Sequence, residues 1–249
     1  MTPKRSGRPN RAVKERREVS AFAMDGVAPE ELLGPLNEVE ERNKPPQLFV
    51  SGDRTLLRRG RPKVSVVGSR KASQQALRRA AQISRMLVDN GVIVVSGLAL
   101  GVDAVAHRSA ITGGGRTIAV IGTPLDRSYP RENAALQAQI ANEHLVVSQF
   151  ASGYQVRPYS FPMRNRTMAL IVDASVIVEA GDSSGTLSQG WEALRLNRPL
   201  FILKSIVDEH PEYKWPNDMM NYGAVLLEDP SDLLDLIPLA DVDVEPLFA

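Results

Sequence analysis

Short apolar runs alternate with stretches of helical periodicity along the middle of the chain. Strands are predicted at 64–67, 92–95, 117–121, 145–147, 175–179 and 200–204, where Val, Ile and Leu follow one another. Between them, apolar side chains at helical spacing predict helices over 76–87, 102–111, 133–142, 163–173 and 187–197. Such continuous runs are typical of strands buried on both faces of a parallel sheet. The pattern predicts an α/β fold: a doubly wound, mostly parallel, extended Rossmann-like sheet with helices on both faces.

The flanks divide the chain further. Residues 1–20 are expected to be a disordered basic arm, and 21–62 a short N-terminal extension with a helical stretch and a strand over 47–50. Residues 63–206 form the predicted core, whose strands are expected to end at 200–204. Residues 207–249 are expected to be an acidic segment that completes or flanks this core.

The net charge of +1 over 249 residues hides a strong asymmetry. Residues 1–18 carry seven basic side chains against two acidic ones, and the segment after residue 206 carries eleven acidic residues against one lysine. The middle is therefore mildly basic. A basic arm is either an electrostatic footprint for nucleic acid or a solvated terminus, and both interpretations stay open.

Composition excludes several classes of site and compartment. The chain has no cysteine, and His107, His144 and His210 lie far apart, so we expect neither disulfides nor a metal site. No signal peptide and no membrane-spanning run is apparent. These features favour a cytoplasmic protein.

Four predicted strands end in loops rich in Gly, Ser and acidic residues. These loops are Gly68-Ser69-Arg70, Ser96 to Asp103, Gly122 to Asp126 and Glu179 to Thr186. The carboxyl ends of parallel strands meet at one edge of a sheet, where glycines and helix N-termini accommodate anions. The sequence therefore predicts a phosphate-binding rim, although each loop alone is also explained as a tight strand–helix turn.

The sequence does not contain the common nucleotide-binding and catalytic motifs. The P-loop GxxxxGK[ST] and the dinucleotide GxGxxG are absent, so we expect no nucleotide hydrolysis by a P-loop and no cofactor. Ser96, Asp103 and His107 could be drawn as a triad, but no GxSxG elbow supports it. His107 follows Asp103 by one helical turn, as a residue of the rim or as a histidine satisfied by that aspartate. No catalytic residue is predicted.

The segment Phe161-Pro162-Met163-Arg164-Asn165-Arg166 opens a predicted helix. Two arginines with a preceding aromatic ring suit a phosphate backbone and a stacked base. A capped helix start with a core phenylalanine explains the same residues equally well.

Taken together, these strings resemble the DprA/Smf family. The resemblance runs from about Pro45 to Lys204 and rests on the rim loops above, on Gly114 to Gly122, on Tyr129-Pro130 and on the Phe161 segment. It implies a Rossmann-like fold, a homodimer, and single-stranded DNA handed to the RecA recombinase, commonly during natural transformation. Because the last residues are acidic, we expect no C-terminal winged helix, which is a departure from the family pattern. By motif, the implied nucleic-acid site comprises Ser69, Arg70, Ser96, Gly97, Gly101, His107, Phe161, Arg164, Asn165, Arg166, Ser184, Gly185 and Thr186.

Two other functions remain as alternatives. One is a nucleotide phosphoribohydrolase resembling the LOG family, disfavoured because Ser188 and Gln189 follow Gly185-Thr186 where a carboxylate base is needed. The other is a sensor of a free nucleotide. If the protein binds single-stranded DNA, we expect its affinity not to depend on the base sequence. We also expect that replacing Arg164 and Arg166 together removes binding without disturbing folding.

Overall fold

The computed structural model describes residues 25–237 of the chain. The basic arm predicted at 1–20 and the end of the acidic segment lie outside these residues. Within them, eight strands form one sheet in the order β1-β5-β4-β3-β2-β6-β7-β8. The strands are β1 (Phe49–Gly52), β2 (Lys63–Gly68), β3 (Ile93–Ser96), β4 (Thr117–Ile121), β5 (Leu145–Ser148), β6 (Ala174–Glu179), β7 (Leu200–Leu203) and β8 (Val225–Leu227).

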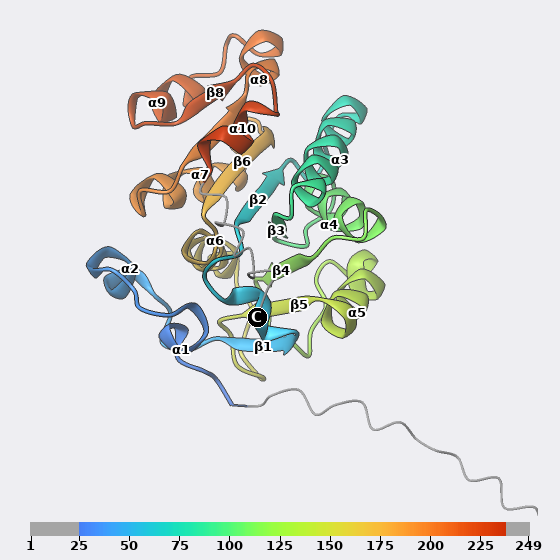
Figure 1. Ribbon diagram of the computed structural model, residues 1–249, viewed down its shortest axis with the longest axis vertical. Helices are drawn as coiled ribbons and strands as arrows, with labels where there is room; N and C mark the ends of the chain where they lie inside the picture. The colour runs from blue at the N-terminus through green and yellow to red at the C-terminus, as the bar shows by residue number, and fades with distance from the viewer. Residues whose placement is uncertain (1–24, 238–249) are drawn as a thin grey trace, which may run out of the picture.

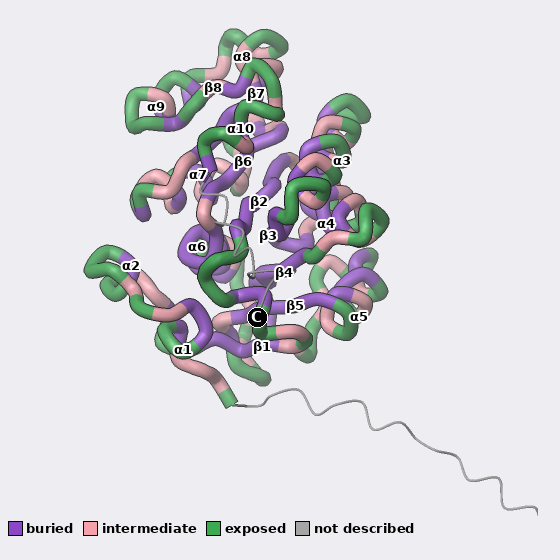
Figure 2. The backbone as a smooth tube through the Cα atoms, viewed as in Figure 1, coloured by how far each residue is buried: buried purple, intermediate pink, exposed green. Residues whose placement is uncertain are grey.

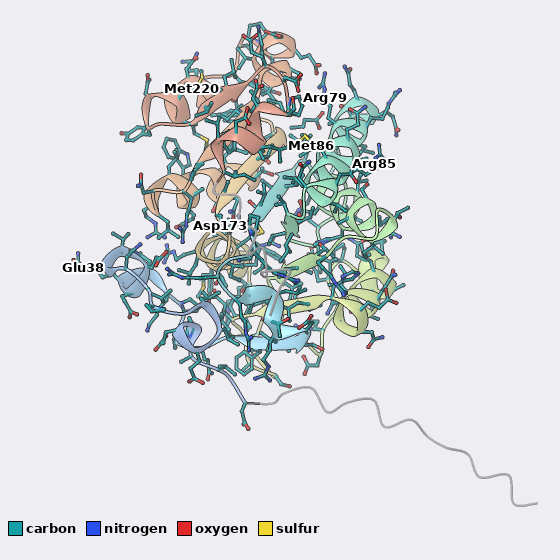
Figure 3. All side chains as sticks on the ribbon, viewed as in Figure 1. Glu38, Arg79, Arg85, Met86, Asp173 and Met220 are labelled. Carbon is teal, nitrogen blue, oxygen red and sulfur yellow. The ribbon has the colours of Figure 1, made fainter. Side chains whose placement is uncertain are left out.

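Helices cover both faces of this sheet, as predicted (Figure 1). The α-helices are α1 (Pro29–Leu33), α2 (Glu38–Asn43), α3 (Gln74–Asp89), α4 (Val102–Thr112), α5 (Ala134–Glu143), α6 (Ser160–Ile171), α7 (Thr186–Arg195), α8 (Lys204–Glu209), α9 (Trp215–Asn221) and α10 (Asp232–Leu236). Helices α3, α4 and α5 lie on one face, and α6 and α7 on the other. The exposed side chains of Glu38 and Arg85 mark the two outer surfaces (Figure 3).

The strand order contains a reversal that positions the site. From β2 the chain moves outward through β3, β4 and β5, then returns to place β6 on the other side of β2. All these pairings are parallel, and only β1 runs antiparallel, beside β5. Ligands of open α/β sheets bind outside the carboxyl ends of the strands at such a reversal. The fold therefore directs attention to the loops after β2, β3 and β6.

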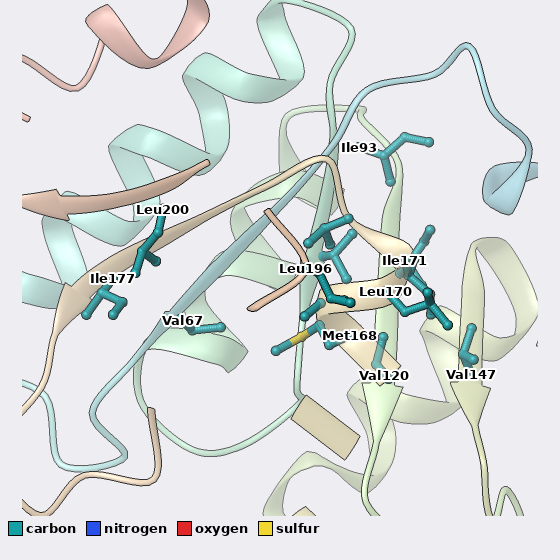
Figure 4. Close-up of a cluster of buried hydrophobic side chains, with 14 of the residues drawn as sticks. Val67, Ile93, Val120, Val147, Met168, Leu170, Ile171, Ile177, Leu196 and Leu200 are labelled. Atoms are coloured by element: carbon teal, nitrogen blue, oxygen red, sulfur yellow. The ribbon is translucent and has the colours of Figure 1, made fainter. Parts of the chain in front are cut away.

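The core lies on both sides of the central strands, which are buried along their length (Figure 2). On one face, side chains of α6 pack on Val67, Val120 and Ile177 (Figure 4). On the other, Ala76, Ala80, Ile83 and Leu87 of α3 pack against the sheet, which confirms the helical spacing of these residues. The apolar runs are buried on both faces because helices cover both.

Three elements differ from the sequence prediction. The strands do not end at 200–204, because β8 adds to the sheet beyond β7. Its short run of Val and Leu lies in an acidic stretch, where composition conceals it. The helical stretch before Pro45 is two short helices separated at Gly34-Pro35, and α6 begins at Ser160 rather than 163. Pro162 fits its first turn, where a backbone N–H has no intrahelical acceptor anyway.

The helices of residues 25–237 are short or polar. None of the helices there is both long and apolar enough to cross a bilayer.

Candidate nucleic-acid interface

A large open cavity lies where the sheet reverses direction. Its volume is about 900 Å³. The loop after β2 contributes Gly68 to Lys71, the loop after β6 contributes Gly181 to Thr186, and α6 contributes its first turns. Predicted site residues on its lining are Ser69, Arg70, Phe161, Arg164, Asn165, Ser184, Gly185 and Thr186.

The cavity is strongly basic. Arg70, Lys71 and Arg157 line it and are exposed, and the buried Arg164 adds a fourth cation. Asp103 is the one acidic side chain among the described residues that line it. A concave surface lined by one sign of charge concentrates ligands of the opposite sign. The cavity is therefore suited to a polyanion.

Arg164 is held inside the protein by α6. Its side chain is only 6% exposed, and its Nη1 donates to the carbonyls of Gly97, after β3, and of Val120 in β4, the latter at 2.8 Å. Its Nε donates to Asn165 Oδ1 at 2.9 Å. The guanidinium thus ties α6 to two strands of the sheet. This burial and these hydrogen bonds argue against the expectation that replacing Arg164 leaves folding undisturbed, which stays a prediction to be measured.

Asp103 lies in the first turn of α4 and is 5% exposed. One of its carboxylate oxygens accepts from the backbone N–H groups of Gly97 and Ala99, both at 3.2 Å. Burial raises the pKa of Asp103, and the positive charge of Arg164 opposes that rise. Burial likewise lowers the pKa of Arg164, and the negative charge of Asp103 counteracts this decrease. Each of these two charges is stabilised by the other, because neither side chain is well solvated.

Phe161, in the first turn of α6, forms the apolar part of the cavity. Its half-buried ring lies 5.3 Å from the ring of Tyr129, at an angle of 42°. The guanidinium carbon of Arg70 lies 5.5 Å from the centre of the Phe161 ring. An aromatic ring beside exposed cations is the combination that single-stranded nucleic acids require for base stacking and phosphate contact.

Two glycines permit the close packing beneath the cavity. A Cβ on Gly97 would lie 1.8 Å from Arg164 Nη1, so only glycine leaves room for the guanidinium. Gly101 has φ +74°, and a Cβ there would lie 2.3 Å from the carbonyl oxygen of Ser69. Gly101 therefore lets the β2 loop lie against the start of α4. It supports the cavity without lining it.

The loop after β6 is tied to its neighbours by side-chain hydrogen bonds. Thr186 Oγ1 donates to the carbonyl of Gly68 at 3.0 Å, and Asn165 Nδ2 donates to the carbonyl of Gly185 at 3.2 Å. Ser184 Oγ accepts from the backbone N–H of Thr186 at 3.2 Å. These bonds join the loops after β2 and β6 to α6 as one rim.

Three other predicted residues do not reach the cavity. Ser96 is fully buried, and its hydroxyl donates to the carbonyl of Val66 at 2.7 Å. Arg166 is half-exposed and pairs with Glu192 of α7 at 3.3 Å. His107 is fully buried and packs behind the rim. Sequence spacing placed all three near the site, but the helical rotation and strand pleat point their side chains elsewhere.

His107 has a defined tautomer. Its Nδ1 lies 2.7 Å from Thr117 Oγ1, whose own proton goes to the carbonyl of Val94 at 2.8 Å. Nδ1 must therefore carry the proton, and the buried Nε2 has no hydrogen-bond partner within residues 25–237. Burial, aided by the charge of Arg164, lowers the pKa of His107 from 6.5 to about 3.

This shift predicts a loss of stability in mild acid. Because the unfolded chain takes up a proton near pH 6.5 while the folded chain does not, stability falls as pH falls below 6.5 toward the folded pKa of about 3. From pH 7.5 to 5 we expect His107 to contribute a loss of about 2 kcal/mol, measured by urea unfolding at each pH. His107→Asn keeps a donor near Nδ1 and should flatten this part of the profile. An unchanged slope in that variant would assign the effect to other groups.

Sequence reasoning missed three residues of the cavity. Lys71 follows Arg70 directly, and this adjacent pair of cations was the available signal. Arg157 stands among Tyr154, Pro158 and Tyr159 in the loop before α6, a basic residue between aromatic ones. In the sequence, Tyr129 stands out only as part of the Tyr129-Pro130 string of the family resemblance. Its proximity to Phe161 depends on tertiary structure, since 31 positions separate them.

Residues 25–237 offer no grouped metal ligands. No cluster of three or more His, Asp or Glu side chains there is arranged to hold an ion.

The chain is similar to a known protein family over most of its length. The family model described as DNA recombination-mediator protein A matches residues 29–238. This chain belongs to that family. Among curated members, the DNA processing protein DprA of Streptococcus pneumoniae is 42% identical over 165 residues, covering 66% of this chain and 57% of that protein. The Smf protein of Synechocystis is 39% identical over 182 residues, covering 72% of this chain and 46% of that protein. The chain thus spans about half the length of these relatives.

Solved structures of DprA proteins share the fold. DprA from Streptococcus pneumoniae superimposes with a TM-score of 0.72 at 32% identity, covering 88% of this chain and 75% of that one. DprA from Helicobacter pylori, described for its single-stranded DNA binding mode, gives a TM-score of 0.70 at 27% identity, covering 81% and 92%. The expected family and the mostly parallel α/β fold are confirmed.

Proposed function

We propose that this protein binds single-stranded DNA in the cavity at the sheet reversal and acts in DNA processing and RecA-mediated recombination, without catalysis. The observation that carries the proposal is the combination of three exposed cations and a half-buried aromatic ring in one cavity of about 900 Å³. The Helicobacter pylori relative, which has the same fold and binds single-stranded DNA, supports it.

The cavity offers separate contacts for the two parts of a nucleotide. Arg70, Lys71 and Arg157 present charge to successive phosphates, and a guanidinium matches two phosphate oxygens at once. The Phe161 ring presents a face to a base, and Arg70 must leave its position over that ring for the base to stack. A duplex keeps its bases stacked inside, so this arrangement favours a single strand.

Hydrolysis of a nucleotide is the less favoured function. A phosphoribohydrolase needs a carboxylate poised at the substrate, but Gln189 stands in the region after Thr186 and donates to Ser175 Oγ at 3.2 Å. Asp103 is buried and already accepts two backbone N–H groups. Neither residue supplies a free base at the cavity.

Titration of a fluorescent single strand tests the proposed function, with matched duplex and free nucleotides as competitors. We expect single-strand-selective binding whose affinity falls as salt rises, with a log–log slope of about −2 for three neutralised phosphates. Between 50 and 200 mM salt this is roughly a 20-fold loss. Competition by free nucleotide with no affinity for the strand would favour the sensor instead.

We further propose that two copies associate and that the strand-bound protein engages RecA recombinase in the cytoplasm. Support for association comes from one surface beside β8, where Trp191 and Tyr222 are 39% and 74% exposed and touch edge to face. Exposed aromatic surface next to an edge strand is typical of an interface. Sedimentation of the protein alone, and with recombinase and a single strand, tests both proposals.

A further inference from the structure

The outer side of helix α3 carries only arginines and amides along most of its length. The helix has 16 residues, which corresponds to a length of about 24 Å. Its inner side is apolar and packs on the sheet. Before Asp89, its exposed side chains are Gln74, Gln75, Arg78, Gln82 and Arg85, and we call these five residues the α3 face. From Gln75 onward they recur at intervals of three and four residues, so they share one side of the helix.

The charges of the α3 face do not serve the helix itself. Among the three arginines of α3, Arg79 alone pairs with a carboxylate within residues 25–237, that of Glu209 at 2.7 Å. The helix dipole favours acidic residues in the first turn and basic ones in the last. The first turn of α3 has no acidic residue, its last turn has no basic one, and Asp89 stands at its end. Arg78 and Arg85 are therefore exposed cations without a stabilising role in the helix.

The α3 face begins where the cavity ends. Lys71 lines the cavity and stands three positions before the helix. The backbone N–H of Ser73, the N-cap of α3, donates to the carboxylate of Glu179 at 3.2 Å, and Glu179 is the last residue of β6. This bond fixes the start of the helix to the rim. A polyanion that leaves the cavity past Lys71 therefore meets the α3 face next.

The side chains of this face suit a duplex better than a single strand. No residue of α3 is aromatic, so unstacked bases find no ring there to replace their stacking. A duplex keeps its bases stacked and presents its phosphates, which arginine and glutamine side chains can bind. Arg78 and Arg85 are seven positions apart, or about 10 Å along the helix axis. The major groove of a duplex is about 12 Å wide, so the two guanidinium groups can reach phosphates on both of its sides.

We propose that the α3 face binds the duplex part of a DNA that carries a single-stranded tail, while the tail lies in the cavity. The ligand is thus a junction between a single strand and a duplex, and Lys71 lies at the passage from one to the other. This inference rests on the proposed single-strand binding and adds a second contact surface to it. Contacts made by one continuous molecule reinforce each other, because the second contact forms at a high effective concentration.

A set of fluorescent DNAs tests the junction with the intact protein. The set contains a duplex with a short tail, a single strand as long as the tailed strand, and the blunt duplex. We expect the tailed duplex to bind about tenfold more tightly than the single strand, and the blunt duplex to bind more weakly than either. The logarithm of the affinity of the tailed duplex should fall more steeply with the logarithm of salt concentration, by about 2 in slope for two further phosphates.

Tails at the 5′ and 3′ ends are compared as well. A strand backbone has a direction, so a cavity that holds it in one orientation leads only one of its ends past Lys71. We expect the tenfold gain for one tail polarity and not for the other. An equal gain for both polarities overturns a fixed path from the cavity to α3.

Two charge-matched variants test the role of the α3 face. Arg78→Ala with Arg85→Ala should remove the gain of the tailed duplex and its additional salt dependence. Its affinity for the single strand should change less than about threefold, which also reports that the variant is folded. The control is Arg54→Ala with Arg61→Ala, two exposed arginines in the segment before β2, at the amino ends of the strands and away from the cavity. We expect this control to keep the gain.

The outcomes separate this inference from the function beneath it. A tailed duplex that binds no more tightly than the single strand overturns the junction and leaves single-strand binding intact. A gain that survives in the Arg78 and Arg85 variant, or that is lost equally in the control, overturns the assignment to the α3 face. A blunt duplex that binds as tightly as the tailed one shows that the tail contributes nothing and also overturns the junction. No affinity for the single strand or for the tailed duplex overturns the proposed function together with this inference.

Discussion

Replacing Arg164 with methionine is expected to lower the free energy of unfolding by about 3–5 kcal/mol. The change removes the hydrogen bonds to Gly97 and Val120 and leaves the buried carboxylate of Asp103 without its opposing charge. Removing a buried positive charge is costly when a buried carboxylate in its electrostatic field stays desolvated. Urea unfolding followed by circular dichroism measures this loss directly.

Arg166→Met supplies the control for this prediction. It lies two residues further along α6, makes the same change of side chain and removes the same charge. Its guanidinium is half-exposed and pairs with Glu192, so we expect a loss below about 1 kcal/mol. Similar losses for the two variants would show that Arg164 is not a structural part of the rim. Arg164→Lys should fall between them, because it keeps a charge but not the planar fork.

Removing the exposed cations of the cavity is expected to abolish most single-strand binding while leaving stability unchanged. The variant Arg70→Ala, Lys71→Ala, Arg157→Ala loses the groups proposed to contact phosphates, none of which belongs to the core. We expect the affinity for a single strand at low salt to fall about 100-fold. The slope of the logarithm of affinity against the logarithm of salt concentration should change from about −2 toward zero. Fluorescence anisotropy at several salt concentrations measures both.

A second triple variant separates the site from the overall charge. Arg78, Arg85 and Arg108 are exposed on α3 and α4, outside the cavity lining, and their replacement by alanine changes the net charge equally. We expect this control to change affinity less than about threefold, because charges beyond a Debye length are screened. Equal losses in the two variants would mean that the strand follows a general basic surface rather than this cavity.

Local patterns in the sequence were sufficient for most of the fold. The Val and Ile runs at β2, β3 and β6 are buried on both faces, and this alone indicates a parallel sheet. The glycines that follow these runs correctly placed the rim loops. Strand β8 escaped prediction because three apolar residues in an acidic stretch carry little periodicity, and its place in the sheet comes from pairing with β7.

The direction of each side chain was decided by tertiary structure. Arg164 and Arg166 look equivalent in the sequence, but two positions along a helix point to nearly opposite sides of it. The side chain of Arg164 therefore lies inside the protein, and that of Arg166 lies at the surface beside Glu192. Tyr129, Arg157 and Phe161 meet only because separate loops converge at the sheet reversal. The sequence by itself determined the sheet, the rim and the family resemblance, since these depend on local periodicity and ordered motifs. Which cations face a ligand and which support the fold depends on contacts between distant segments, and only the folded chain supplies those.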